Sequence, residues 1–267
     1  MNEAKIEYNA TLISRINITP RLTLLRVRPD SNDFSFKPGQ YVALGLYSSS
    51  PRIPEATTES NGPSETLIRR AYSISSGSSN QSFLEFYISL VSSGELTPRL
   101  FALEENARLF IGPKAKGLFT IESVPSESHI LMVATGTGLA PFMSMLRSNI
   151  LNRPSQLITA LHGARFTWDL GYRNELEELS YRCSNFQYLP VISEPEKCKN
   201  WNGMTGFLPP LLENPKFSET CGFSILPKKT HVFICGNPIM IEQSEKILKA
   251  VGFETKGENT NLHIEKY

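Results

Sequence analysis

The sequence lacks an excess of charge of either sign. Its 267 residues include 27 Lys and Arg against 26 Asp and Glu, which gives a formal net charge of +1 at pH 7. The basic residues are scattered, and the longest basic clusters are pairs. Proteins that bind nucleic acid gather Lys and Arg into patches or stripes, so we do not expect nucleic acid as a partner.

Long apolar runs are also missing. No stretch approaches the roughly 18 apolar residues of a membrane-spanning helix, and residues 1–5 lack the apolar core of a signal peptide. We therefore expect a cytoplasmic protein that does not act in a membrane.

Cysteine is scarce and poorly placed for metal chemistry. The four cysteines are widely spaced in the C-terminal third, and they suggest neither a disulfide framework nor a CxxC metal pair. They also lack the close clustering that an iron–sulfur centre needs. We predict no metal site, and if the protein moves electrons, the one-electron carrier is another molecule. The four cysteines are Cys183, Cys198, Cys221 and Cys235.

The first part of the chain has the pattern of a small β-barrel. At 267 residues the chain is long enough for two medium domains, and we expect two. Up to about residue 124, alternating and β-branched segments predict short antiparallel strands joined by Gly and Pro turns. Residues 48–66, rich in Ser, Pro, Glu and Thr, predict a surface insertion. Strands are expected at 6–12, 22–27, 41–46, 69–75, 83–91, 108–111 and 118–121, with a hairpin joining the fourth and fifth.

From residue 129 the pattern changes to strands that alternate with helices. This alternation predicts a parallel sheet covered on both faces, in which ligands bind at the carboxyl ends of the strands where the strand order reverses. The predicted fold class is thus an N-terminal antiparallel β-barrel, residues 1–124, followed by a doubly wound α/β domain, residues 125–267. Strands are expected at 130–134, 157–161, 186–191 and 231–235, and helices at 139–151, 172–181, 205–212 and 238–251.

One strand of the predicted barrel has side chains suited to a cofactor. Arg70, Tyr72 and Ile74 share one face of the run at 69–75. If the chain holds a flat aromatic cofactor with a charged tail, Tyr72 can stack on the ring, Arg70 can reach phosphates, and Ser73 can hydrogen-bond a ring nitrogen. The alternative is an edge strand with a buried tyrosine and solvated arginines.

Three other short segments favour phosphate binding. Residues 135–138 and 235–238 each place glycine between a strand and a helix, where a phosphate can approach the backbone. The first departs from the dinucleotide fingerprint G-x-G-x-x-G, because Pro141 stands where the fingerprint has its third glycine. The third segment is a predicted helix start with Thr97 as N-cap and Pro98 at the first helical position. The alternatives are an ordinary capped helix and, at Cys235, an inert core thiol.

Taken together, these motifs identify a resemblance. Their order and domain context resemble the ferredoxin–NADP reductase family, its bacterial members most closely. The likeness covers nearly the whole chain except the insertion at 48–66. The motifs are Arg70-x-Tyr72-Ser73, Gly94-x-x-Thr97-x-x-Leu100, Gly136-Thr137-Gly138-x-Ala140-Pro141-Phe142, His162-Gly163-Ala164-Arg165, Asp169-Leu170-x-Tyr172, Cys235-Gly236-Asn237-Pro238-x-Met240 and Glu265-Lys266-Tyr267.

The resemblance implies an FAD-binding barrel and a pyridine-nucleotide domain, and it assigns roles to residues. Tyr72 would stack on the isoalloxazine ring, Arg70 would pair with the pyrophosphate, and Ser73 would contact flavin N5. Ser73, Cys235 and Glu265 would be catalytic. The other expected FAD contacts are Ala71, Tyr87, Glu95, Leu96, Thr97, Thr137 and Tyr267, of which Tyr267 would cover the other flavin face. The expected NADP contacts are Gly136, Gly138, Ala164, Arg165, Ser193, Gly236 and Asn237.

The chain departs from the family pattern where the 2′-phosphate of NADP is expected. Glu194 and Phe207 stand at positions where the bacterial members usually have arginine. A carboxylate beside a ribose favours a free 2′-OH, whereas Arg165 favours the phosphate. Lys197 or Lys199 can compensate for the missing arginines. We expect NADPH as the first choice, with NADH as a competitor.

The resemblance implies a monomeric, FAD-dependent reductase. It would exchange a hydride with NADP(H) and single electrons with a separate ferredoxin or flavodoxin. One alternative is an NADH-preferring reductase that feeds an oxygenase or free flavins. Another is a flavin-binding electron-transfer subunit without turnover of its own, which the presence of Cys235 and Glu265 disfavours.

Overall fold

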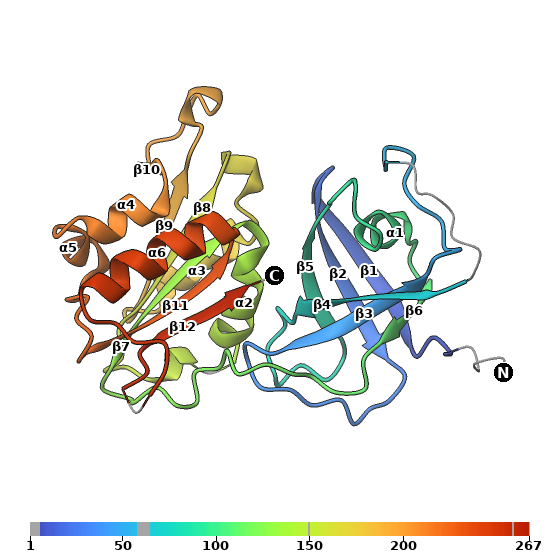
Figure 1. Cartoon of the computed structure of the whole chain (residues 1–267), viewed down its shortest axis with the longest axis horizontal. Coiled ribbons are helices and arrows are strands. Elements are labelled where there is room, and N and C mark those ends of the chain that lie inside the picture. The colour runs from blue at the N-terminus through green and yellow to red at the C-terminus, as the bar shows by residue number, and fades with distance from the viewer. Residues whose placement is uncertain (1–5, 58–64, 149, 258, 267) are drawn as a thin grey trace. The chain divides into compact units, whose positions relative to one another are not determined.

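The computed structural model describes residues 6–57, 65–148, 150–257 and 259–266. The chain divides into two compact units, which are described separately below (Figure 1). The barrel unit comprises Met1–Thr120 and Met143–Ser148, and the α/β unit comprises Ile121–Phe142 and Asn149–Tyr267. In the described part of the chain, no helix is both long and apolar enough to span a bilayer.

The barrel unit is a six-stranded antiparallel sheet in the order β4-β3-β6-β1-β2-β5. Its core consists of inward-facing side chains such as Leu12, Leu25, Leu44 and Phe86, because alternate residues of each strand face inward. Helix α1 (Thr97–Ala102) follows β5 and adds Leu100 to this core. The strands are β1 (Ala10–Thr19), β2 (Leu22–Pro29), β3 (Tyr41–Tyr47), β4 (Leu67–Ser73), β5 (Leu84–Ser89) and β6 (Arg108–Ile111).

A buried carboxylate joins residues 143–148 to this unit. Glu85 on β5 accepts hydrogen bonds from Arg26 Nε at 2.9 Å and from Arg147 Nη1 at 2.7 Å. Arg147 also donates to the Ser75 carbonyl at 3.0 Å. A buried carboxylate is stable only when it is paired in this way, so the Arg147 segment belongs to the packing of the barrel unit.

Three local predictions for this unit are wrong. The strands β4 and β5 form no hairpin ladder, because β4 pairs with β3 and β5 pairs with β2, and one isolated bridge between Ile74 and Phe86 joins the two ends of the sheet. Residues 118–121 form no strand. The start of β3 is instead joined to Lys116, through an isolated bridge to Tyr41. The N-cap of α1 is Leu96, and the Thr97 hydroxyl bonds to Val91.

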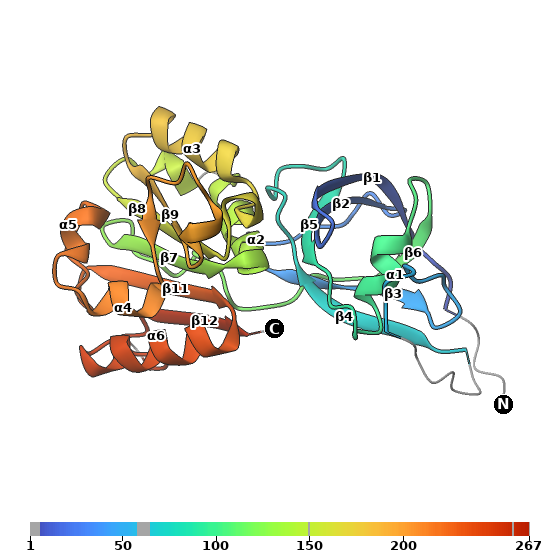
Figure 2. The same ribbon diagram turned by 90° about the horizontal axis from the view of Figure 1, so that it is seen from above.

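The α/β unit is a six-stranded parallel sheet in the order β10-β9-β8-β7-β11-β12. The chain moves outward from β7 to β10 and then crosses to β11 on the other side of β7, so the strand order reverses between β7 and β11. Figure 2 shows α2 and α3 on one side of the sheet and α4 and α6 on the other. The strands are β7 (His129–Thr135), β8 (Ile158–Ala164), β9 (Phe186–Ile192), β10 (Met204–Thr205), β11 (Thr230–Gly236) and β12 (Leu262–Lys266).

The helices that follow β7 in the chain are mostly those expected, with some shorter than predicted. The glycine turn after β7 is a 3₁₀ helix, η1 (Gly136–Leu139), and α2 ends at Leu146 rather than near residue 151. The helix α5, the short strand β10 and the terminal strand β12 were not predicted. The helices are α2 (Ala140–Leu146), α3 (Arg173–Arg182), α4 (Leu208–Glu213), α5 (Phe217–Cys221) and α6 (Pro238–Ala250), with 3₁₀ turns η2 (Ile150–Asn152), η3 (Thr167–Asp169) and η4 (Pro195–Lys197).

Candidate functional site

Strand β4 presents Arg70 and Tyr72 on its core-facing side. Their partners across the ladder are Leu44 and Val42, which belong to the barrel core. Tyr72 packs against that core, and burial raises the pKa of its phenol, while the Arg70 charge lowers it by less. The Arg70 side chain is exposed and forms an ion pair with Glu95. The strand thus offers an aromatic ring beside an exposed guanidinium, as the alternation predicted.

Three arginines surround the loop that precedes α1. Besides the Arg70 ion pair, Arg52 donates to the Gly94 carbonyl at 3.1 Å, and Arg99 donates to the Glu95 carbonyl at 2.6 Å. Sequence reasoning missed Arg52 and Arg99. The sequence signal for Arg99 was its place in a short, otherwise apolar helix. In the structure its side chain is only 2% exposed. This concentration of cations suits a phosphate-bearing ligand.

The other predicted flavin contacts lie around the same strands. Ser73 is buried at the end of β4, and Ala71 is exposed in its middle. Tyr87 is buried on the face of β5 opposite the core residues Phe86 and Ile88. Leu96 is a core side chain, and the Thr97 hydroxyl lies 3.0 Å from both the amide nitrogen and the carbonyl oxygen of Val91.

The two glycine turns of the α/β unit pack against each other at the reversal of strand order. A Cβ at Gly138 would lie 2.3 Å from the Cys235 carbonyl oxygen, and a Cβ at Gly236 would lie 2.3 Å from Thr135 Oγ1. The Asn237 amide also donates to Thr135 Oγ1 at 2.7 Å. Only glycine permits this approach, and the turns end neighbouring parallel strands, which is where such sheets bind phosphates.

The predicted catalytic residues of this unit occupy the same edge of the sheet. Cys235 is fully buried near the end of β11, in register with Ala134 on one side and Glu265 of β12 on the other. Asn237 uses its side chain as the N-cap of α6, accepting from the Ile239 amide at 2.9 Å. The structure therefore brings Cys235, Glu265 and the glycine turns together.

A charged cluster lies at the ends of β8 and β9. Arg165 Nε donates to Glu194 Oε1 at 2.8 Å, and Lys197 Nζ donates to Glu194 Oε2 at 2.7 Å. Both cations also lie 5.1 Å from the centre of the Phe166 ring. Hydrogen bonds from Arg165 and Lys197 hold the pKa of the Glu194 carboxyl below its usual value, so it is ionised at neutral pH.

Backbone contacts fix the position of this cluster. The Ser193 amide donates to the Ala164 carbonyl and the Glu194 amide donates to the Arg165 carbonyl, each at 3.0 Å. Sequence reasoning left Lys197 and Lys199 as alternative replacements for a missing arginine. Lys197 reaches Glu194, and Lys197 and Lys199 both line a hollow of about 600 Å³ beside Trp168 and Trp201.

Phe207, at the second position where an arginine is usual, is exposed just before α4. Thr137 is half-buried in η1.

Tyr267, expected to cover a flavin, lies outside the described residues. Within the described residues, no group of three or more His, Cys, Asp or Glu side chains is arranged to hold a metal ion.

Comparisons with known proteins identify the family. Residues 132–246 match the family described as "Oxidoreductase NAD-binding domain". The flavodoxin/ferredoxin–NADP reductase of Buchnera aphidicola (subsp. Baizongia pistaciae) is 31% identical over 213 residues, which cover 80% of this chain and 79% of that protein. This chain belongs to the ferredoxin/flavodoxin–NADP reductase family. Family membership makes it an oxidoreductase.

Other members of the family support this assignment. The flavodoxin/ferredoxin–NADP reductase of Escherichia coli K12 is 31% identical over 211 residues, or 79% of this chain and 77% of that protein. Among solved structures, a ferredoxin NADP+ reductase from Neisseria gonorrhoeae with bound FAD and NADP has a TM-score of 0.82 at 24% identity, covering 98% of this chain and 99% of that chain. The predicted family and fold class are confirmed.

Proposed function

We propose that this protein is an FAD-dependent reductase that exchanges a hydride with NADP(H) and single electrons with a ferredoxin or flavodoxin. The observation that carries this proposal is that Arg70, Tyr72 and Ser73 lie together on β4 of a chain that belongs to the family. The related Buchnera and E. coli proteins are named for flavodoxin and ferredoxin, and the Neisseria structure holds FAD and NADP.

The barrel unit has the groups that FAD requires. Tyr72 offers a partly buried ring face for an aromatic ligand, and Arg52, Arg70 and Arg99 surround the loop at Glu95, where a pyrophosphate would replace the carboxylate as the partner of Arg70. The buried hydroxyl of Ser73 can hydrogen-bond the ring. When bound, FAD supplies the step between two-electron and one-electron chemistry, which no side chain can perform.

The α/β unit has the groups that a nicotinamide dinucleotide requires. The turns at Gly138 and Gly236 expose backbone that a pyrophosphate can approach, and Cys235 and Glu265 lie at the same edge of the sheet, where they would border the nicotinamide. The buried Cys235 side chain would help to keep water away from a nicotinamide bound at this edge, and the Glu265 carboxylate would offer a proton-accepting group next to it.

The charged cluster supports NADPH over NADH, though weakly. Arg165 and Lys197 supply two positive charges that a 2′-phosphate can pair with, while the Glu194 carboxylate and the nearby Asp169 carboxylate oppose that attraction. The phosphate must displace the Glu194 carboxylate from its partners, which reduces the gain. The same carboxylate can accept a hydrogen bond from a free ribose 2′-OH, and this observation keeps NADH as the second candidate.

Steady-state rates test the proposal. The purified protein should be yellow, and with a non-specific acceptor such as ferricyanide it should oxidise NADPH about tenfold more efficiently than NADH, measured as kcat/KM. Adding a bacterial flavodoxin or ferredoxin as the acceptor should support NADPH oxidation. A protein that cannot be reconstituted with FAD would contradict the proposal. One that binds FAD but is not reduced by either nucleotide would also contradict it, and would favour a flavin-binding subunit without turnover.

A further inference from the structure

The α/β unit contains a buried histidine beside its first glycine turn. His162 lies on β8 at 0% exposure and is in register with Ala134 of β7, one residue before the end of that strand. Both ring nitrogens of a buried imidazole need hydrogen-bond partners. A buried histidine therefore lowers the stability of the fold unless neighbouring groups form hydrogen bonds with it.

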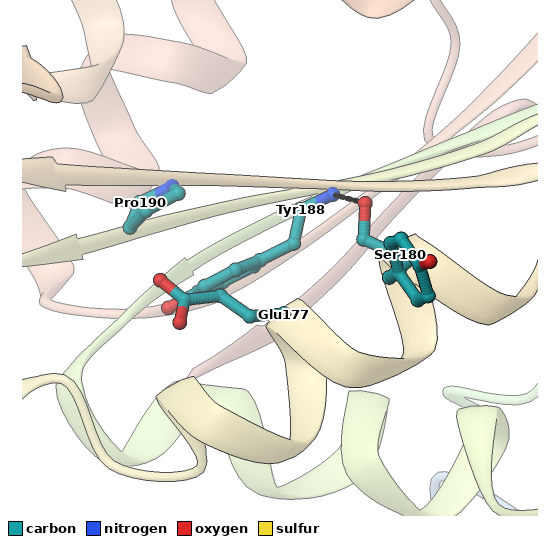
Figure 3. A pocket seen from close by; sticks show the side chains of 5 residues that line it. Glu177, Ser180, Tyr188 and Pro190 are labelled. Carbon is teal, nitrogen blue, oxygen red and sulfur yellow. Dashed lines mark hydrogen bonds between the residues drawn. The ribbon is translucent and has the colours of Figure 1, made fainter.

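The first ring nitrogen has a well-held partner. His162 Nδ1 lies 3.0 Å from the hydroxyl oxygen of Tyr188, a buried residue of β9. The Tyr188 amide in turn donates to Ser180 Oγ of α3 at 3.3 Å, and Figure 3 shows this contact between the strand and the helix. Because a tyrosine hydroxyl can donate or accept, this contact alone does not choose the tautomer of His162.

The second ring nitrogen differs from the first. Nε2 of His162 is buried, and among the described residues no hydrogen bond of ordinary geometry reaches it. Burial lowers the pKa of His162 to about 4, and the polar backbone of Gly136 opposes that shift in part. The imidazole is therefore neutral at pH 7 and has one N–H. A carbonyl oxygen can only accept, so its partner nitrogen must carry the proton.

We propose that His162 is a positioning residue for the nucleotide-binding turn: its Nε2–H donates to the Gly136 carbonyl while Nδ1 accepts from the Tyr188 hydroxyl. Gly136 has a left-handed φ of +52°, and no atom lies within 4 Å of where its Cβ would be. The turn thus lacks side-chain packing at this point. A buried hydrogen bond from His162 would supply the missing restraint.

This restraint has a consequence for the ligand. In a trans peptide, the carbonyl of one residue and the N–H of the next point in opposite directions. Holding the Gly136 carbonyl toward His162 therefore turns the Thr137 N–H away from it, toward the open side of the turn. This role rests on the proposed function, because it assumes that the turn binds the phosphates of NADP(H).

The tautomer can be measured without any activity. In ¹⁵N-histidine-labelled protein, two-bond ¹H–¹⁵N spectra distinguish a protonated Nε2 from a protonated Nδ1, and the His162→Gln variant assigns the signals. We expect neutral His162 with its proton on Nε2 at pH 7. A proton on Nδ1 would overturn the proposal, whether or not the protein turns over NADPH.

Substitutions then test the role in binding. His162→Phe keeps the volume but removes both nitrogens, and it should weaken NADP+ about tenfold, a factor that corresponds to about 1.4 kcal/mol. It should raise KM for NADPH and NADH alike while kcat and flavin content stay near wild type. His162→Gln places an amide N–H near the position of Nε2–H and should recover most of the affinity. Full NADP+ affinity in the Phe variant, or equal loss in both variants, would overturn the proposal.

The control is another histidine of the same strand pair. His129, at the start of β7, accepts a hydrogen bond from the Leu157 amide at 3.3 Å, at the end of the sheet away from the turns. His129→Phe should lower stability without changing NADP+ affinity. If His162→Phe does not fold, Tyr188→Phe replaces it: without the hydroxyl, the Gly136 carbonyl should still keep the proton on Nε2, and a proton on Nδ1 in this variant would overturn the role assigned to that carbonyl. A wild type inactive with both nucleotides would refute the proposed function alone, since the tautomer is measured independently.

Discussion

The two units build their candidate ligand surfaces in different ways. The barrel unit relies on side chains, namely Tyr72 and the arginines Arg52, Arg70 and Arg99. The α/β unit relies on backbone, because its turns meet where Gly138 and Gly236 leave no room for a Cβ. Truncating one of several side chains removes only part of the binding energy. A substitution that blocks a close backbone approach removes the whole contact. We therefore expect different sensitivities to mutation in the two units.

The largest effect should follow from a single methyl group at the glycine turns. In Gly138→Ala, the new Cβ would lie 2.3 Å from the Cys235 carbonyl, and backbone on both sides would have to move. NADP+ affinity should fall at least a hundredfold, measured by titration calorimetry. The flavin content should stay near wild type, because Gly138 belongs to the α/β unit.

A neighbouring glycine provides the control. At Gly136 the added methyl meets no atom within 4 Å, so Gly136→Ala introduces only the strain of a left-handed alanine, about 1–2 kcal/mol. Its effect on NADP+ affinity should be clearly smaller than that of Gly138→Ala. Equal losses in the two variants would mean that steric approach between the turns is not what requires glycine at 138.

The second effect is acid sensitivity, which should be confined to the α/β unit. All four histidines lie there, and burial lowers the pKa of each, to about 4 for His162 and His263. An unfolded histidine takes up a proton near pH 6.5, whereas folded His162 resists it until about pH 4. Stability is therefore complete above pH 6.5 and is lost as the pH falls toward 4, by up to about 3 kcal/mol for His162.

The two units have separate optical reporters for this test. Both tryptophans, Trp168 and Trp201, belong to the α/β unit, and bound flavin would report on the barrel unit. Urea titrations followed by tryptophan fluorescence should show a midpoint that falls between pH 7 and pH 4.5. The pH dependence should weaken in His162→Gln. A midpoint independent of pH would show that these histidines remain accessible to protons in the folded state.

The third effect is loss of flavin from the barrel unit. Tyr72→Ala removes a ring face whose stacking should contribute on the order of 1 kcal/mol beyond its buried area, so FAD affinity should fall about tenfold or more. Arg70→Ala should act in the same direction. The ratio of flavin to protein absorbance measures the loss, and tryptophan fluorescence should show an intact α/β unit.

The matched control for this prediction is Tyr181→Ala. Tyr181 is 92% exposed on α3, so its removal should leave the flavin content unchanged. If Tyr72→Ala also retains its flavin, Tyr72 is only a packing residue of the barrel core.

The smallest effect concerns nucleotide choice at exposed side chains. Arg165→Ala should lower NADPH affinity about tenfold and leave NADH nearly unchanged, because only NADPH has a 2′-phosphate. Glu194→Arg should increase the preference for NADPH. Ratios of kcat/KM for the two nucleotides measure both effects.

Arg182→Ala serves as the control for charge alone, since Arg182 is an exposed arginine of α3 paired with Glu178. It should leave the ratio unchanged. Equal losses of NADPH and NADH in Arg165→Ala would place this arginine at the pyrophosphate or in a structural role.

Sequence patterns predicted the α/β unit better than the barrel. The strands at β7, β8, β9 and β11 and the helix α6 were all found close to their expected bounds, because each buried parallel strand is a continuous apolar run and each helix follows it locally. The hairpin between β4 and β5 and the strand at 118–121 were wrong. Antiparallel pairing in a barrel joins segments far apart in the chain, and local alternation does not specify the partner.

The amino-acid sequence by itself determined the residues that any ligand would meet: the Arg70-x-Tyr72-Ser73 strand, the glycines of both turns, and Glu194 in place of an arginine. Their types fix charge, ring area and backbone freedom before any folding. Only the tertiary structure decided that Lys197 shares Glu194 with Arg165, that Arg52 and Arg99 bond to the loop at Gly94 and Glu95, and that His162 lies in register with Ala134, next to the first glycine turn. These contacts join segments separated by tens of residues, and a long-range contact depends on strand order and register, which short-range patterns do not encode.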